Sequence, residues 1–323
     1  MRADRSLIDT IGNMPVIRLD FQSEQLRIYA KCEFLNPSGS IKDRFARCVI
    51  DDAEQHGVLH DDSIILECSS GNTGIALAML GAARGYPVTI VMPRKASCER
   101  SHLIRQFGGT VVTFDSDGYQ RGVELTHEMA ARDDRYFLPR QFENPLNALD
   151  HEHSTGVEIL AQVSCPIDGF VAGYGTGGTL AGISRALRRA NRQTRIYAME
   201  PAEAALLLGE TPCCHSIEGL AAGSVPALLN DIKFDGVLKL KSLDAQRMAQ
   251  RLSREFGLLV GTSSGANVAA ALELGRQMGK EATIVTVLCD RAERYFSTPL
   301  FARATTVEPA HHTRDSRARV AAV

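Results

Sequence analysis

The sequence of 323 residues lacks the features typical of membrane, metal-binding and nucleic-acid-binding proteins. Its apolar runs are too short to span a bilayer, and no apolar segment follows the charged N-terminus, so neither a membrane span nor a signal peptide is predicted. The net charge of −2 gives no reason to expect a nucleic acid as partner. The eight cysteines form no C-x-x-C pair and the nine histidines no H-E-x-x-H pattern, which argues against a metal site. We expect a cytoplasmic protein with reduced cysteines.

What the chain does contain is a regular alternation of short apolar strands and helices. Hydrophobic residues make up 44% of the chain, as in a globular protein, and the length suits two domains. Strands are predicted at 15–19, 27–33, 63–67, 87–92, 110–114, 169–172, 195–200, 258–261 and 282–288, and helices at 45–56, 75–84, 97–107, 154–163, 180–190, 242–256 and 266–278. The short connections favour parallel sheets covered by helices on both faces. Residues 304–323 lack apolar periodicity and are predicted to be a disordered tail.

The most informative stretch is NPSGSIKDR at residues 36–44. Its Asn-Pro and Ser-Gly pairs are turn signals, Ser40 suits an N-cap, and Asp43 falls in the first turn of the helix that follows. Lys42 then lies at a helix start, where the backbone amides favour the neutral amine. A lysine of lowered pKa can form a Schiff base with an aldehyde. Taken alone, Lys42 is better explained as a solvated lysine between two turns, and only the other stretches of the chain favour a cofactor site.

Two further loops join a strand to a helix and suit anion binding. In Gly173–Thr179 (GYGTGGT), bare backbone amides meet a helix N-terminus. The same loop satisfies G-x-G-x-x-G, and Glu200 ends the next strand, so this unit alone fits a dinucleotide as well as a single phosphate. The second loop, SSGNTG at 69–74, fits an anion site or a well-capped helix start. The dinucleotide interpretation leaves Lys42 and residues 69–74 without a role.

Together these stretches resemble the fold-type II pyridoxal-phosphate enzymes, and most closely the cysteine synthase (O-acetylserine sulfhydrylase) family, over residues 7 to 301. The resemblance implies a tryptophan synthase β-like α/β fold of two three-layer domains with mostly parallel sheets and the cofactor in the cleft between them. We expect a smaller, mobile domain at 36–150 and a larger one formed by 1–35 plus 151–303. Relatives are homodimers, and some bind the C-terminus of serine acetyltransferase.

The resemblance also assigns roles to single residues. Lys42 is expected to carry pyridoxal 5'-phosphate and to act as the catalytic base. The cofactor is further held by Asn72 at the ring hydroxyl, by Ser263 at the pyridine nitrogen, and at the phosphate by Gly175, Thr176, Gly177, Gly178 and Thr179. The amino-acid substrate is bound by Ser69, Ser70, Gly71, Thr73, Gln141, Gly219 and Ala221. No metal is expected. A hydroxyl at Ser263, rather than a carboxylate, makes the cofactor a weaker electron sink and favours β-elimination over transamination.

Two stretches bear on the second substrate. The segment CDRAERY at 289–295 is similar to that of sulfhydrylases that accept thiosulfate, and Cys289 is expected to line the pocket without acting as a nucleophile. At 217–223, Glu218 stands where relatives have Gln, and Ala221 replaces a glycine. A carboxylate here suits a cationic nucleophile, and the extra β-carbon narrows the site.

The expected reaction is β-replacement on an activated serine through an aminoacrylate intermediate. The sequence favours O-acetylserine over O-phosphoserine as the donor. Sulfide or thiosulfate would give L-cysteine or S-sulfocysteine. The same chemistry with homocysteine, giving cystathionine, or with an amine, giving a diaminopropionate-type product, stays open. More distant alternatives are a nicotinamide-dependent oxidoreductase and a non-catalytic regulator that retains the fold.

Overall fold

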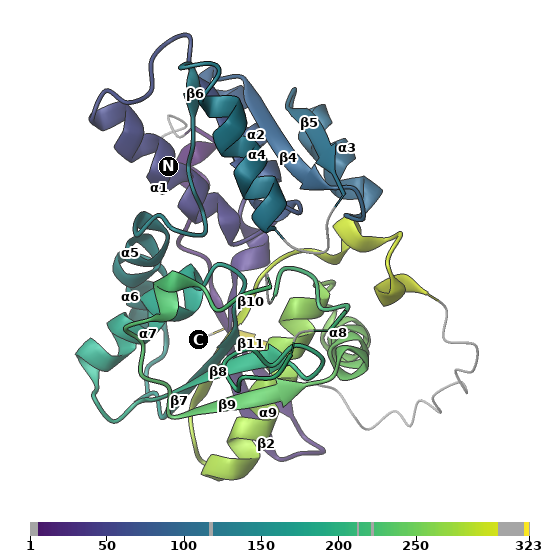
Figure 1. Cartoon of the computed structure of the whole chain (residues 1–323). Coiled ribbons are helices and arrows are strands. Elements are labelled where there is room, and N and C mark those ends of the chain that lie inside the picture. The colour runs from purple at the N-terminus through teal and green to yellow at the C-terminus, as the bar shows by residue number, and fades with distance from the viewer. Residues whose placement is uncertain (1–5, 116–118, 212, 221–222, 303–319, 323) are drawn as a thin grey trace.

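The computed structural model describes residues 6–115, 119–211, 213–220, 223–302 and 320–322, which form two separate sheets (Figure 1). The four-stranded sheet has the order β5-β4-β3-β6, and all its neighbours are parallel. Its strands are β3 (Ile64–Cys68), β4 (Val88–Pro93), β5 (Thr110–Phe114) and β6 (Tyr136–Phe137). This sheet occupies the upper half of Figure 1 and the larger sheet the lower half.

The larger sheet has seven strands in the order β11-β1-β2-β10-β7-β8-β9. The run from β2 to β9 is parallel, whereas β1 pairs antiparallel with β2 and β11. Its strands are β1 (Val16–Phe21), β2 (Leu26–Cys32), β7 (Gly169–Gly173), β8 (Arg195–Pro201), β9 (Gly236–Leu240), β10 (Ile284–Leu288) and β11 (Val320–Ala322).

Helices cover both faces of each sheet, in keeping with inner strands β4 and β10 that are buried along their whole length. The described helices are α1 (Lys42–Gln55), α2 (Asn72–Arg84), α3 (Cys98–Gln106), α4 (Gln120–Ala130), α5 (Leu146–His153), α6 (Thr155–Gln162), α7 (Gly178–Ala190), α8 (Ser242–Phe256) and α9 (Thr262–Met278), with short 3-10 turns at Ile8–Thr10, Glu33–Leu35, Ala227–Leu229, Ala292–Tyr295 and Pro299–Phe301.

The core residues show how each three-layer unit forms. Adjacent strand residues point to opposite faces, so Ile65 packs in the core with α1 and α2, while Leu66 packs beneath α4. In the larger sheet, Val171 packs against α8 and α9, and Phe170 packs against α6 and α7. The predicted α/β class with mostly parallel sheets and two three-layer units is therefore confirmed.

Several local predictions are corrected. Helix α1 begins at Lys42, as the turn signals predicted, although the apolar pattern alone placed the helix from residue 45. The N-cap position is occupied by Ile41 rather than Ser40, but Ser40 Oγ accepts from Lys42 N–H at 3.3 Å. Helix α9 begins at Thr262, so the strand predicted at 258–261 is reduced to an isolated bridge between Val260 and Arg291. The sequence did not indicate α4, α5, β6 or β9. Within the predicted tail, residues 320–322 form β11, and 303–319 lie outside the described residues.

A buried ionic cluster joins α1 to the larger unit. The Arg44 guanidinium donates to both oxygens of Glu33, at 2.7 and 2.8 Å, and to both oxygens of Glu158, at 2.8 and 2.7 Å. Lys31 lies 2.6 Å from Glu158, and the side chains of Arg44, Glu33 and Lys31 are fully buried. Because Arg44 lies on the first turn of α1, this cluster fixes the helix start that carries Lys42.

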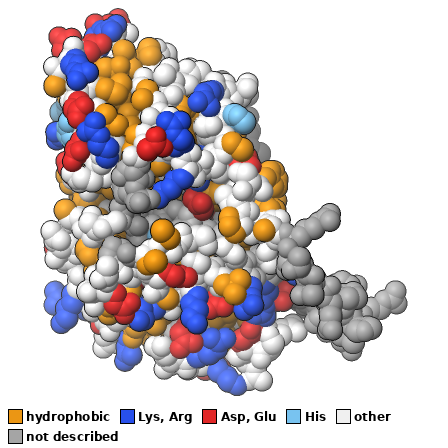
Figure 2. Space-filling view, turned by 45° about the vertical axis from the view of Figure 1, so that its right-hand side comes forward, with side chains coloured by type: hydrophobic (Ala, Val, Ile, Leu, Met, Phe, Trp, Pro, Cys, Tyr) orange, Lys and Arg blue, Asp and Glu red, His pale blue; other side chains and the backbone are white. Residues whose placement is uncertain are grey.

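No helix in the described parts of the chain combines the length and hydropathy needed to cross a membrane. On the face shown in Figure 2, acidic and basic side chains are interspersed.

Candidate active site

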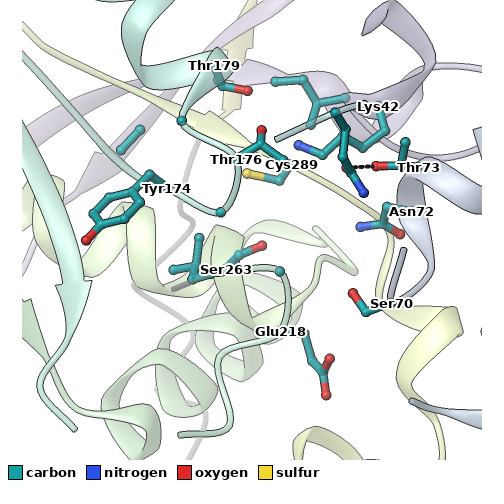
Figure 3. Close-up of a pocket in the computed structure, with 18 of the residues that line it drawn as sticks. Lys42, Ser70, Asn72, Thr73, Tyr174, Thr176, Thr179, Glu218, Ser263 and Cys289 are labelled. Atoms are coloured by element: carbon teal, nitrogen blue, oxygen red, sulfur yellow. Dashed lines mark hydrogen bonds between the residues drawn. The ribbon is translucent and has the colours of Figure 1, made fainter. Parts of the chain in front are cut away.

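A cavity lies between the two sheets and collects most of the predicted site residues (Figure 3). Two helices start at it: α2 follows the carboxyl end of β3, and α7 follows the carboxyl end of β7, the place where parallel α/β sheets bind ligands. The predicted residues that line the cavity are Lys42, Ser69, Ser70, Asn72, Thr73, Gln141, Gly175, Thr176, Gly177, Thr179, Gly219 and Ser263. Gly71 packs against Arg100 and Gly178 against Asn147, while Ala221 lies outside the described residues.

Lys42 is held in the cavity by its backbone neighbours. Ile41 N–H donates to the Cys289 carbonyl at 2.9 Å, and Asp43 accepts a 2.7 Å bond from Ser38 N–H. Burial lowers the pKa of Lys42, and the nearby Cys289 and Asp290 oppose this shift only in part. The structure thus gives Lys42 the lowered pKa that the sequence suggested, with burial as the main cause. A neutral amine can act as a nucleophile and as a base.

The glycine-rich loop at the start of α7 has no room for larger side chains. A Cβ at Gly175 would lie 2.3 Å from the Gly219 carbonyl oxygen, and one at Gly178 would lie 2.1 Å from Asn147 Oδ1. Gly177 adopts a φ of +88°, which favours glycine. The loop therefore exposes backbone amides at a helix N-terminus, an arrangement that binds anions.

The two threonines of this loop are oriented from behind by α5. Asn147 Nδ2 donates to Thr176 Oγ1 at 3.0 Å, which leaves the hydroxyl proton of Thr176 free to donate into the cavity. His151 lies between Thr155 Oγ1, 2.9 Å from Nδ1, and Thr179 Oγ1, 3.1 Å from Nε2. Burial holds the pKa of His151 well below its usual range, so it is neutral and can accept from Thr155 and donate to Thr179. In the described residues, no group of three or more His, Cys, Asp and Glu side chains could hold a metal ion.

Glu200 is not available to a dinucleotide. Its side chain is fully buried, and it accepts hydrogen bonds from the Tyr174 hydroxyl and, at 2.7 Å, from Leu207 N–H. A ribose-binding carboxylate has to face the ligand, whereas Glu200 joins Tyr174 to the following loop. The G-x-G-x-x-G match thus lacks its acidic partner.

The loop at 69–74 is braced by Gln141. Ser69 Oγ accepts from Gly71 N–H at 3.0 Å and from Gly74 N–H at 3.2 Å, the capping role that its composition also suggested. Thr73 Oγ1 donates to Gln141 Oε1 at 2.6 Å, the dashed contact in Figure 3. Gln141 is held in turn by Glu67, a buried carboxyl that accepts its N–H at 3.0 Å and whose pKa burial raises to about 7. These bonds fix the loop before any ligand enters.

The 289–295 segment holds Asn72 in one orientation. Arg294 donates to Asn72 Oδ1, and Asn72 Nδ2 donates to Asp290 at 2.6 Å. Burial raises the pKa of Cys289 to about 12, so this side chain is a thiol, consistent with a lining role rather than a nucleophilic one. Ser263 lies in the first turn of α9 and also lines the cavity.

Sequence reasoning did not identify several lining residues: Arg100, Tyr119, Phe142, Asn267 and Tyr295. Of these, Arg100 matters most, because its Nη1 lies 2.9 Å from Glu218 Oε2. Glu218 is therefore paired, which corrects the expectation that its carboxylate would steer a cationic nucleophile. No local pattern around Arg100 distinguishes it from a solvated helix residue.

Comparisons with known proteins find relatives along nearly the whole chain. A family model described as "Pyridoxal-phosphate dependent enzyme" matches residues 7–290. Cysteine synthase of Staphylococcus aureus (strain N315) is 39% identical over 299 residues, which cover 92% of this chain and 96% of the relative. The crystal structure of O-ureido-L-serine synthase matches with a TM-score of 0.90 at 40% identity, over 95% of this chain and 98% of that one. The O-acetylserine dependent cystathionine beta-synthase from Helicobacter pylori matches with a TM-score of 0.87 at 32% identity, over 93% and 100%.

Proposed function

Because this chain belongs to the pyridoxal-phosphate dependent enzymes and is a cysteine synthase-like enzyme, we propose that it replaces the β-substituent of O-acetylserine with a sulfur nucleophile. The family resemblance found in the motifs is thereby confirmed, and pyridoxal 5'-phosphate is the cofactor. The observation that carries the proposal is the convergence of one half-buried lysine of lowered pKa with the N-termini of α2 and α7 on one cavity.

The residues present fit the cofactor. Lys42 would hold it through the amine, and the amides of 175–179 with the Thr176 and Thr179 hydroxyls would hold its phosphate. Gly175 and Gly178 support this assignment, because a β-carbon at either would collide with the Gly219 carbonyl or with Asn147 and push the loop out of the position that exposes its amides. Asn72 Oδ1 accepts from Arg294 and one N–H of Nδ2 donates to Asp290, so the second N–H, 3.4 Å from the Tyr295 hydroxyl, would be the one to donate to the acceptor oxygen of the cofactor ring. Ser263 supplies a hydroxyl for the ring nitrogen.

When bound, pyridoxal phosphate supplies an electron sink that stabilises negative charge at the substrate Cα. The chain supplies the proton transfer: the neutral amine of Lys42 removes the proton from Cα and returns it at the end of the cycle. Burial of this amine supports the role, because it lowers the pKa of Lys42 and so favours the neutral form that can accept a proton.

We assign the substrate carboxylate to the start of α2. Ser69, Ser70 and Thr73 line the cavity, and the loop that they form with Gly71 would donate hydrogen bonds to the carboxylate. Gln141 would reach the same group. Gly219 and Ala221 would border the β-carbon from the opposite loop. The bonds from Thr73 to Gln141 and from Gln141 to Glu67 support a preformed pocket that orients Cα toward Lys42.

We also propose that residues 36–150 move as a unit when substrate binds, since they contain the whole four-stranded sheet, and that 1–35 plus 151–303 stay fixed. A cytoplasmic homodimer that binds the C-terminus of serine acetyltransferase is proposed from the family resemblance. Size-exclusion chromatography with and without that C-terminal peptide would test the assembly.

The decisive experiment is an absorbance spectrum of the pure protein, followed by O-acetylserine and then by one nucleophile at a time. We expect a visible band that shifts to longer wavelength with O-acetylserine and returns when sulfide is added. A visible band that does not shift on addition of O-acetylserine would refute this donor, and O-phosphoserine would be tested next. If homocysteine or an amine returns the shifted band to its original position and sulfide does not, that compound is the nucleophile and sulfide is excluded. No visible band after adding pyridoxal phosphate would refute the proposed chemistry.

A further inference from the structure

Besides Lys42, the cavity contains an ion pair, formed by Arg100 and Glu218, whose members come from opposite sides of the cavity. Arg100 comes from α3, which packs beside the four-stranded sheet, and Glu218 comes from the loop that follows β8 of the seven-stranded sheet. Both side chains line the cavity, and they are its only charged side chains besides Lys42 in the described part of the chain. Figure 3 places Glu218 and Thr179 at opposite ends of the site. The pair thus lies away from the proposed phosphate site.

Arg100 is fixed in place and shielded from water. Its Nε donates to Ser97 Oγ at 2.9 Å, and its guanidinium lies 5.3 Å from the centre of the Tyr295 ring. The stem of Arg100 packs on Gly71, where a β-carbon would lie 2.2 Å from Cδ. The side chain is only 3% exposed, whereas that of Glu218 is 28% exposed. Arg100 therefore cannot turn outward to find a counter-ion in solvent.

A buried cation without a counter-ion attracts anions strongly, because little water screens it. Burial of Arg100 works against its charge, but the carboxylate of Glu218 outweighs this and keeps the arginine pKa raised. The two side chains are thus both charged and cancel each other. The Glu218 N–H donates to Thr262 Oγ1 at 3.0 Å, which helps to hold the carboxylate beside its partner.

We propose that Glu218 is a specificity-determining residue for the second substrate, a proposal that rests on the β-replacement function above. By cancelling the charge of Arg100, it keeps the cavity suited to an uncharged nucleophile such as hydrogen sulfide or a neutral thiol. It disfavours a dianion such as thiosulfate, which would meet the carboxylate without a free cation to bind. Of the two inorganic sulfur nucleophiles that the sequence left open, sulfide and thiosulfate, the pair thereby favours sulfide.

The test compares the wild type with Glu218→Gln, which keeps the size of the side chain and its hydrogen bond to Arg100 but frees the positive charge. We expect kcat/KM for thiosulfate, relative to sulfide, to rise about tenfold, equivalent to about 1.4 kcal/mol, and to fall again with added salt. Glu99→Gln is the matched control, because Glu99 precedes Arg100 but bonds Ser297 instead, at 2.7 and 2.8 Å. The control should keep the wild-type ratio.

A binding measurement gives a readout that does not depend on turnover. Thiosulfate is titrated calorimetrically into the cofactor-loaded proteins without a serine donor. We expect binding to Glu218→Gln, none at the same concentrations to the wild type or Glu99→Gln, and loss of binding in the double variant Arg100→Gln/Glu218→Gln. Equal binding by wild type and Glu218→Gln, or binding that survives in the double variant, would overturn the proposal. If no nucleophile supports turnover of O-acetylserine, the proposed function fails, but the titration still decides the role of Glu218.

Discussion

Replacing Arg44 by Met should destabilise the protein more than almost any other single exchange of a charged residue. The guanidinium makes four hydrogen bonds to carboxylates, two to Glu33 and two to Glu158, and a fifth to Ser154 Oγ at 3.3 Å. The Arg44 and Glu33 side chains are fully buried. A methionine fills much of the same space but leaves Glu33 as a buried carboxylate without a cation. Asn36 Nδ2, 2.8 Å from Glu33, is a neutral donor and cannot replace the lost charge.

The expected loss in free energy of unfolding can be calculated in two ways. Removing one partner of a buried ion pair costs about 3–5 kcal/mol in free energy of unfolding. The ionic hydrogen bonds from Arg44, with a smaller contribution from Lys31, also outweigh burial and lower the pKa of Glu158 from 4.5 to about 2. A shift of that size corresponds to about 3 kcal/mol of stability at neutral pH, before any discount for the partial exposure of Glu158. We therefore expect Arg44→Met to lose about 3–4 kcal/mol.

Urea unfolding at pH 7, followed by far-ultraviolet circular dichroism, measures this loss. Arg84→Met is the matched control, because Arg84 also pairs with two carboxylates, Asp51 and Glu54, but is 29% exposed. An exposed pair contributes about 1 kcal/mol or less, so the control should change little. If both variants lose the same free energy, burial does not set the strength of the Arg44 cluster and the reasoning is refuted.

Three further outcomes follow from the site and the cluster. Lys42→Ala should lower turnover of O-acetylserine about a thousandfold in steady-state kinetics, since no other lysine lines the cavity in the described part of the chain. Normal turnover would exclude the proposed base. Gly178→Ala should weaken cofactor binding about tenfold when apoprotein is titrated with pyridoxal phosphate and followed by absorbance, because the new β-carbon would lie 2.1 Å from Asn147 Oδ1. Unchanged affinity would mean that the loop shifts to accommodate the β-carbon. Because the pKa of Glu158 is lowered to about 2, the stability that this carboxylate contributes is complete above about pH 5 and is lost as the pH falls toward 2. The urea midpoint of Glu158→Gln should therefore fall less between about pH 5 and 3 than that of the wild type. An equal fall in both proteins would mean that another group causes the acid sensitivity.

The parts of the site that sequence analysis found are those encoded by short contiguous patterns. A turn-rich segment before a helix predicted Lys42, and two glycine-rich strand-to-helix loops predicted the starts of α2 and α7, all of which line one cavity. The N-cap of α1 was assigned to Ser40 rather than Ile41, because Ile41 is held by a hydrogen bond to the Cys289 carbonyl, a contact distant in sequence. Strand β9 was missed because it pairs at the edge of the sheet and is only half-buried, so its apolar pattern is weak.

The residues that sequence analysis missed act through partners distant in the chain. His151 shows no pattern that reveals its bond to Thr179, and the resemblance to dinucleotide folds suggested a role for Glu200 that its burial beside Tyr174 excludes. A local pattern gives the residue type and the element, but whether a charged side chain faces a ligand, a partner or the core is decided by tertiary packing.

Glu218 shows why this distinction bears on function. As a departure from the family pattern it is visible in the sequence, and a lone carboxylate at a cavity would attract cations. Its pairing with Arg100 reverses that expectation, because a compensated pair attracts neither sign and instead removes the cation that an anionic nucleophile would need. Contiguous motifs, such as the one around Lys42, therefore predict the reaction class of this enzyme. The proposed choice of nucleophile depends instead on the Arg100–Glu218 pair, which forms only when the two sheets come together.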